Sequence, residues 1–150
     1  MSELSDMYQE VILDHNKFPR HFKKLDDATH SVEGYNPLCG DKLTVYLRLK
    51  DNVIEETSFI GSGCAISKAS ASMMTHKLKG LTITEAELLI QNVHQMLTGK
   101  IPDRSTISKL GNLAALSGVS KFPMRVKCAT LAWHTFKAAL AGADKEVSTE

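Results

Sequence analysis

The chain has 150 residues and a formal net charge of +1, so we expect a single domain over 1–150 and no broad basic surface for nucleic acid. Its first residues are acidic and no apolar run is long enough to cross a bilayer, so neither a signal peptide nor a membrane segment is predicted. The three cysteines form no C-x-x-C pair and suggest no disulfide framework. These features predict a cytoplasmic protein with reduced thiols.

The first half of the chain predicts one helix followed by strands. Apolar residues recur at helical spacing from Leu4 to Ile12, and Pro19 disfavours helix in the residue before it. Alternating apolar and polar side chains then indicate a half-buried strand that begins directly after Asp41. The expected elements are a helix over 4–16, a polar loop over 17–27, strands over 28–35, 43–49 and 53–60, and a hairpin turn at 51–52.

The second half predicts helices. Gly61-Ser62-Gly63 is expected to end the strand pattern, Thr82 with Glu85 matches a capping box, and Pro123 suits the first position of a helix. The expected helices cover 65–79, 82–97, a segment from Ser105 that carries Ile107, Leu110 and Leu113 and is interrupted at Gly118, and 123–140, with a loop over 100–104. This order predicts an α+β fold, a small antiparallel sheet with helices packed mainly on one face.

All three cysteines lie at ends of these elements, and the first stands in a Cys39-Gly40-Asp41 turn. A single free cysteine is more often a small buried hydrophobe than a ligand. Three of them beside such a turn favour a metal site, because zinc accepts thiolate and carboxylate ligands in a tetrahedron. The candidate ligands are Cys39, Asp41, Cys64 and Cys128.

Arg125 and the histidines give weaker signals than these four residues. Arg125 precedes Cys128 by one helical turn and could offset the negative charge of the ligands, but a solvated surface charge is an equal reading. The six histidines include no pair at short ligand spacing, and His76, His94 and His134 are expected on helices as surface or satisfied residues.

Three stretches resemble the signature segments of U-type iron–sulfur cluster assembly proteins, the family that includes the SufU and IscU branches and the N-terminal domain of NifU. The stretches are Asn36-Pro37-Leu38-Cys39-Gly40-Asp41, the segment from Gly61 to Met74 around Cys64, and Arg125-Val126-Lys127-Cys128-Ala129. The resemblance extends from the first helix to about Leu140. It implies an IscU-like fold.

Within that family the chain is most similar to the SufU branch. IscU proteins have a histidine before the third cysteine, where this chain has Lys127, and a Leu-Pro-Pro-Val-Lys chaperone motif, where this chain has Lys121-Phe122-Pro123-Met124-Arg125. The segment between Cys64 and Cys128 is also longer than in IscU. These differences favour sulfur transfer over a scaffold role served by a dedicated Hsp70 pair.

The resemblance implies a zinc-dependent sulfurtransferase, or sulfur carrier. It implies Zn²⁺ on the four candidate ligands and Cys39 as the acceptor of sulfane sulfur from a pyridoxal-phosphate-dependent, SufS-type cysteine desulfurase, with downstream iron–sulfur assembly proteins as further partners. Two alternatives stay open: a scaffold that carries a transient iron–sulfur cluster on the same thiolates, and a structural zinc adaptor.

Overall fold

The structure is a computed structural model that describes residues 3–37, 39–100, 110–142 and 147–148, without the side chains of 3–8 and 147–148. Its elements in chain order are α1 (Glu3–Lys17), β1 (His30–Asn36), β2 (Asp41–Lys50), β3 (Val53–Ser62), α2 (Ala65–Leu78), α3 (Ile83–Leu97), the 3-10 helix η1 (Gly111–Lys121), α5 (Pro123–Leu140) and β4 (Val147–Ser148).

The sheet has the strand order β3-β2-β1-β4. Strand β2 pairs antiparallel with β1 and β3, and the short β4 pairs parallel with β1 at the sheet edge. The predicted alternation in β2 is confirmed, because Leu43, Val45 and Leu47 are buried while the polar residues between them face the other side. Asp51 and Asn52 form the predicted turn, both with positive φ.

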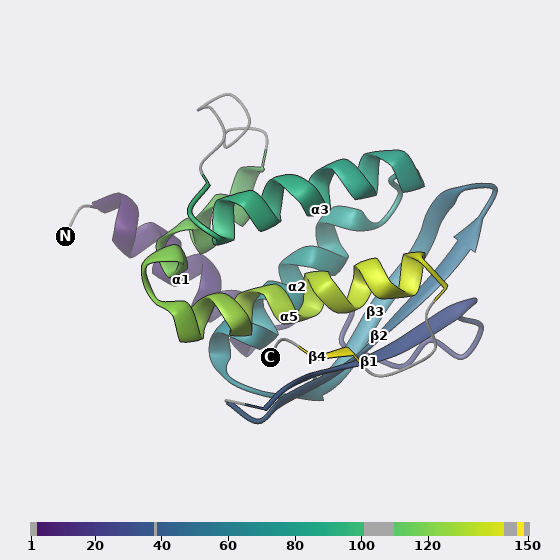
Figure 1. Ribbon diagram of the computed structural model, residues 1–150, viewed down its shortest axis with the longest axis horizontal. Coiled ribbons are helices and arrows are strands. Elements are labelled where there is room, and N and C mark those ends of the chain that lie inside the picture. Colours follow the sequence, from purple (N-terminus) through teal and green to yellow (C-terminus); the bar gives the residue numbers. More distant parts are fainter. Residues whose placement is uncertain (1–2, 38, 101–109, 143–146, 149–150) are drawn as a thin grey trace.

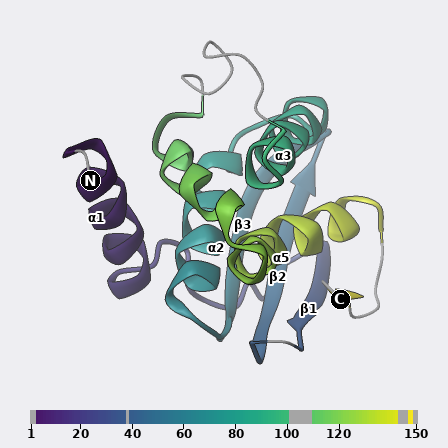
Figure 2. The same cartoon turned by 60° about the vertical axis from the view of Figure 1, so that its left-hand side comes forward.

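The helices lie on one side of this sheet (Figures 1 and 2). Helices α2 and α5 contact the strands, and α1, α3 and η1 pack farther out against these two helices or one another. Gly34 in β1 allows α5 to approach closely, because a Cβ at this position would lie 2.0 Å from Thr135 Oγ1. The predicted α+β fold, with helices gathered mainly on one face, is therefore confirmed.

Hydrogen bonds of Ser70 hold α2 against α5. The Ser70 hydroxyl donates to the carbonyl of Ala129 at 2.6 Å and accepts from Trp133 Nε1 at 3.0 Å. The neighbouring α2 residues on the inward side are alanine and serine and are fully buried, so the two helix backbones come close together. Since Cys64 begins α2 and Cys128 precedes Ala129, this contact also fixes the distance between two of the cysteines.

Of two predicted interruptions, one is displaced and one is wrong. Strand β3 continues through Gly61 and Ser62, which pair with Leu43 and Lys42 of β2, and it ends there, so the break predicted over 61–63 falls at Gly63. Gly118 lies inside η1 and does not break it. The physical reason is the spacing of the large buried side chains, which recur every three positions as a 3-10 helix requires, at Leu110, Leu113, Leu116 and Val119; the small Ala114 and Ala115 between them are also buried.

Of the predicted helix that begins at Ser105, residues 105–109, with Ile107, lie outside the described part of the chain, as does most of the loop predicted at 100–104. The remaining element boundaries agree with the predictions within a few residues. Thr82 and Glu85 form the predicted capping box, and Pro123 is the first residue of α5. The side chains of Leu4, Met7 and Tyr8 on α1 are outside the described part.

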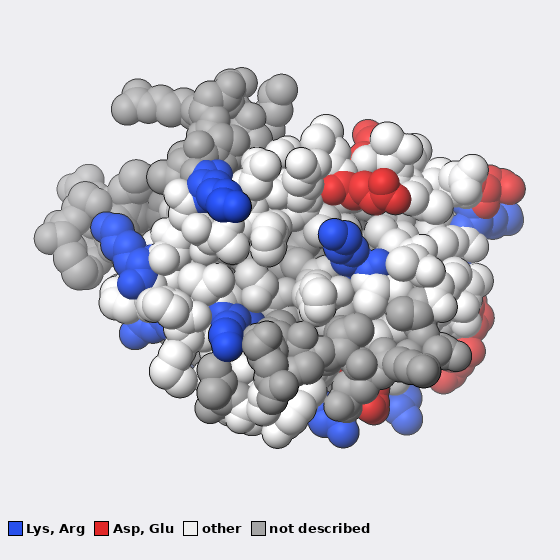
Figure 3. Space-filling view, viewed as in Figure 1, with Lys and Arg blue, Asp and Glu red and all other residues white. Residues whose placement is uncertain are grey.

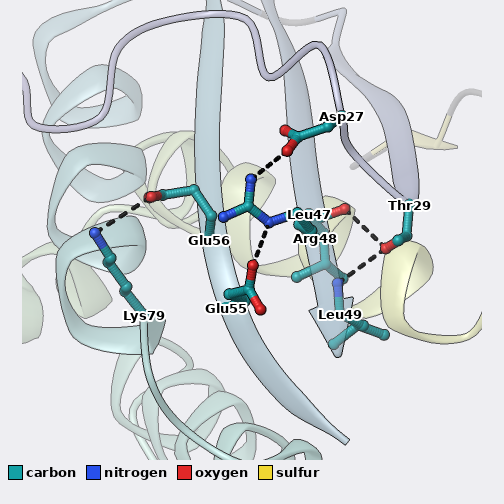
Figure 4. A network of polar contacts seen from close by, with 8 residues as sticks. All are labelled: Asp27, Thr29, Leu47, Arg48, Leu49, Glu55, Glu56 and Lys79. Carbon is teal, nitrogen blue, oxygen red and sulfur yellow. Dashed lines mark hydrogen bonds and ion pairs between the residues drawn. The ribbon is translucent and has the colours of Figure 1, made fainter. Parts of the chain in front are cut away.

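Figure 3 shows the charged side chains on the face that carries α3 and α5. Lysine and arginine side chains there stand mostly apart from one another, and the acidic side chains lie in the right-hand half of the view. At the β2–β3 hairpin, Arg48 contacts Asp27 and Glu55, and nearby Glu56 contacts Lys79 (Figure 4). None of the described helices combines the length and apolarity that a membrane crossing requires.

Candidate metal centre

The four candidate ligands come from three separate segments that meet at one end of the sheet. Cys39 and Asp41 lie in and directly after the tight turn between β1 and β2, Cys64 precedes α2, and Cys128 lies in the second turn of α5. One ligand atom from each of Cys39, Asp41 and Cys128 lies within 4.8 Å of the others. Cys64 is not part of this group of three but lies next to it, with its Sγ 3.9 Å from Asp41 Oδ2. The structure thus brings together side chains that are up to 89 positions apart in sequence.

Asn36 orients the Asp41 carboxylate from the opposite strand. The two residues form the last pair of the β1–β2 ladder, and the Gly40 N–H closes the turn by donating to the Asn36 carbonyl at 2.9 Å. Gly40 has φ +72°, a conformation that favours glycine. The buried Asn36 amide donates to Asp41 Oδ2 at 3.3 Å and to Cys128 Sγ at 3.6 Å. This side chain therefore links the turn to α5.

Cys64 is held by both its backbone and its sulfur. Its N–H donates to Asp41 Oδ1 at 2.8 Å, and its Sγ caps α2 by accepting from the Ser67 N–H at 3.4 Å. Gly63 is needed beside it, because a Cβ at this position would lie 2.6 Å from Asp41 Oδ1. Asp41 is itself completely buried, so its two oxygens are directed at this junction alone.

The three sulfur atoms differ in accessibility. Cys39 is exposed, Cys64 is half-buried, and Cys128 is buried in α5. The Cys128 thiol donates to Cys39 Sγ at 3.3 Å. Burial raises the pKa of Cys128 far above its ordinary value, and hydrogen bonds with Cys39, Cys64 and Asp41 raise it further. Without a cation nearby, this thiol keeps its proton.

These donors fit a borderline-soft divalent cation. Three sulfurs and one carboxylate oxygen converge, and none of the ion pairs found in the described part of the chain involves Asp41. Zinc takes such sulfur and carboxylate ligands, and iron–sulfur clusters take thiolates.

Arg125 does not contact these ligands. It is exposed on the first turn of α5, and its guanidinium lies over the Phe122 ring at 4.5 Å from the ring centroid. Sequence reasoning missed two residues that build the centre. The sequence assigns neither Asn36 nor Gly63 a role at the ligands, although the register of a hairpin closing at Asp41 places Asn36 opposite the carboxylate.

Comparisons with known proteins agree with this geometry. A family model described as the NifU-like N-terminal domain matches residues 7–141. The chain is 42% identical over 140 residues to the zinc-dependent sulfurtransferase SufU of Bacillus subtilis, covering 93% of both chains. It is also 42% identical over 134 residues to the iron–sulfur cluster assembly scaffold protein IscU of Thermotoga maritima, covering 89% of this chain and 92% of the relative.

A solved structure has the same fold. It is the crystal structure of a candidate iron–sulfur cluster assembly scaffold protein for the SUF system from Fervidobacterium islandicum AW-1. The two chains superpose with a TM-score of 0.82 at 36% sequence identity, covering 93% of this chain and 99% of the other. The likeness therefore extends over nearly the whole of both molecules.

Proposed function

The chain belongs to the NifU-like N-terminal domain family, and from this premise we propose that it is a zinc-dependent sulfurtransferase. It accepts sulfane sulfur from a SufS-type, pyridoxal-phosphate-dependent cysteine desulfurase and passes this sulfur on for iron–sulfur cluster assembly. The observation that carries the proposal is the convergence of the three cysteines with Asp41 at one end of the sheet. The likeness to SufU of Bacillus subtilis supports the choice of reaction.

Cys39, Asp41, Cys64 and Cys128 would hold the zinc ion. When bound, zinc keeps thiolates deprotonated and is itself neither oxidised nor reduced. Asn36 would orient the carboxylate through the 3.3 Å hydrogen bond to Asp41 Oδ2. This ligand set and the identity of the ion are part of the proposal.

Cys39 is the thiol best placed to receive sulfur. It is exposed on a turn whose next residue is Gly40, whereas Cys64 caps a helix and Cys128 is buried. Its thiolate would attack the terminal sulfur of the persulfide on the desulfurase, forming a new S–S bond on Cys39 and breaking the one to the desulfurase cysteine. The desulfurase cysteine leaves as a thiolate. No external oxidant or reductant is needed.

The start of α5 would meet the desulfurase. Phe122 and Met124 are exposed there, with 48% and 56% of their surfaces accessible, and Arg125 stacks on Phe122. An apolar patch with one cation, one helical turn from Cys128, suits a partner that brings an apolar contact and an acidic group. Free thiols fit a reducing compartment such as the cytoplasm.

A scaffold role is the second candidate. It is favoured by the 42% identity to IscU of Thermotoga maritima, and it would use the same thiolates to hold an iron–sulfur cluster. The two functions differ in what the protein carries when purified without air. Colourless protein with one zinc ion supports sulfur transfer, and brown protein with iron and sulfide supports the scaffold.

The deciding experiment is incubation with a SufS-type desulfurase and free cysteine, followed by alkylation and peptide mass spectrometry. A persulfide on Cys39 supports the proposed transfer. Iron and sulfide accumulating on the protein with no persulfide on any cysteine would replace it with the scaffold function. The zinc-loaded protein without desulfurase serves as the control for sulfur acquired from solution.

A further inference from the structure

A half-polar cavity lies between α1, α2 and the start of η1, away from the candidate metal centre. It has a volume of about 250 Å³, and its polar lining comes from His15, His76, Lys77 and Asn112. His76 is twelve residues beyond Cys64 on α2, so the cavity is displaced from that cysteine by roughly 18 Å along the helix axis. Figures 1 and 2 show α1 beside α2 on the side of the molecule remote from β4.

His15 is the buried polar group of this cavity, with only 6% of its surface exposed. Its Nδ1 lies 2.7 Å from the hydroxyl oxygen of Ser72, which also accepts the Arg20 N–H at 2.8 Å. Ser72 is completely buried, and within the described chain its hydroxyl has no other acceptor than His15 Nδ1. An unpaired buried hydroxyl proton is costly, so Ser72 donates to Nδ1.

This hydrogen bond determines where the imidazole proton resides. Burial lowers the pKa of His15, and the charge of Arg20 lowers it further, so the ring is neutral at neutral pH. A neutral ring that accepts at Nδ1 carries its proton on Nε2. Nε2 has no hydrogen-bond partner among the residues that the structure describes and is not among the fully buried unpartnered atoms, so His15 presents an accessible N–H donor to the cavity that it lines.

The rest of the polar lining is also rich in donors. Lys77 contributes an ammonium group. Its Nζ lies next to Gly111 at the start of η1, where an added Cβ would be 4.0 Å from it. Asn112 contributes an amide, His76 contributes a second imidazole, and no acidic residue lines the cavity in the described part of the chain. His76, Lys77 and Asn112 are exposed at the rim, so the half-polar cavity leads from solvent to the N–H of His15.

We propose that this cavity binds a small oxyanion, either inorganic phosphate or the carboxylate of a short organic acid, through His15 Nε2, Lys77 and Asn112. A volume of about 250 Å³ suits such an ion and is smaller than most pockets for larger organic ligands. The floor is apolar, from Leu110 and Leu113, so the anion contacts the polar wall and rim. This site is independent of the proposed sulfur transfer.

The test uses the full chain labelled with ¹⁵N and long-range ¹H–¹⁵N spectra of the histidine rings. The free protein should show His15 as the neutral tautomer protonated at Nε2. Titration with sodium phosphate or sodium acetate, at ionic strength matched with sodium chloride, should shift the His15 ring and Asn112 amide signals saturably. Saturation by phosphate alone or by acetate alone identifies the class of anion, and either result supports the site.

Lys77→Met and Lys137→Met form a matched pair, because both lysines are exposed in the last turn of a helix. Lys77→Met should weaken binding about fivefold, the upper end for one exposed ion pair, and Lys137→Met should not change it. A proton on His15 Nδ1, a linear shift with neither anion saturating, or equal effects of the two variants would each overturn the proposal.

Discussion

The ionisable groups around Arg48 and those around Asp41 both gather on the sheet, but they are organised in opposite ways. At the β2–β3 hairpin, Arg48 is paired with Asp27 and Glu55, and Glu56 is paired with Lys79 (Figure 4). At the other cluster, a completely buried carboxylate faces sulfur atoms, and none of the ion pairs in the described part of the chain brings it a cation. In the first cluster every carboxylate has a cation of the chain as its partner, whereas the carboxylate of the second has none among the described residues. Such imbalance is typical of functional sites.

The largest effect is expected for Cys39→Ser, which removes the exposed thiol of the unbalanced cluster. Persulfide formation and stimulation of desulfurase turnover should be lost, because a hydroxyl does not attack the sulfane sulfur. Zinc should be partly retained, because the serine oxygen or water can take the place of the thiolate as a ligand. Peptide mass spectrometry after alkylation measures the first effect. If the first sulfane sulfur in the wild-type chain is found on Cys64 or Cys128, Cys39 is not the acceptor.

The next effect is expected for Asp41→Ala. Loss of the carboxylate removes one proposed ligand and leaves the buried Cys64 N–H without its 2.8 Å partner, so zinc should become more labile, sulfur transfer should change, and stability should fall by about 1–3 kcal/mol. The fold should be mostly retained. Chelator competition, transfer assays and urea unfolding check these outcomes. Zinc affinity and a transfer rate equal to those of the wild type would contradict the ligand role.

The protonation of Cys128 gives a test in the metal-free protein. The pKa of this thiol is raised by burial in the folded state, so from pH 9.0 upward the unfolded chain releases a proton that the folded chain keeps. Stability should therefore fall as pH rises above 9.0, by about 1.4 kcal/mol per pH unit. Urea unfolding of chelated wild-type protein and Cys128→Ala isolates this slope, which the variant should lack.

Zinc binding should depend on pH in the opposite direction from the stability of the metal-free protein: it should strengthen as pH rises. A metal ion binds the thiolate, so zinc uptake should release protons and the affinity should decline as pH falls. Proton release can be measured with a pH indicator in weak buffer. Two results would show that Cys128 does not titrate as the geometry implies. One is an equal slope of unfolding free energy against pH above 9.0 in metal-free wild type and Cys128→Ala, and the other is zinc uptake without proton release.

A smaller effect is expected for Arg125→Ala. This exposed residue stacks on Phe122 and touches none of the four ligands, so zinc content should stay near that of the wild type. If Arg125 meets an acidic group of the desulfurase, sulfur transfer should slow severalfold, and the salt dependence of the rate should weaken. Lys121→Ala, another exposed cation just before α5, is the matched control. An unchanged rate of sulfur transfer would mean that Arg125 is only a solvated surface charge.

The sequence predicted the fold and the candidate ligands because both depend on local patterns. The alternation in β2, the capping box at Thr82 and the Pro123 start of α5 are each readable within a few residues. The Cys-Gly-Asp turn is equally local. What the sequence did not predict depends on contacts across the fold, such as the Asn36 amide reaching both Asp41 and Cys128.

The type of helix at η1 could not be predicted for a different reason. Leu110 and Leu113 fit either a 3.6-residue or a three-residue period, and only their burial together with Leu116 and Val119 distinguishes the two. No local pattern singles out Ser70 among the residues of α2. Its role in joining α2 to Ala129 and Trp133 requires the packed pair of helices.

The smallest effect is expected for Arg48→Gln, in the cluster whose carboxylates are paired with cations. Arg48 is half-buried, but its partners Asp27 and Glu55 are exposed, so water and salt replace most of what the pairs contribute. The melting temperature should fall slightly at low ionic strength and match the wild type at high ionic strength. Zinc content and transfer rate should be unchanged at both. A loss of zinc or of transfer in this variant would mean that the two clusters are coupled through β2, and that the charge deficit around Asp41 is not confined to its own end of the sheet.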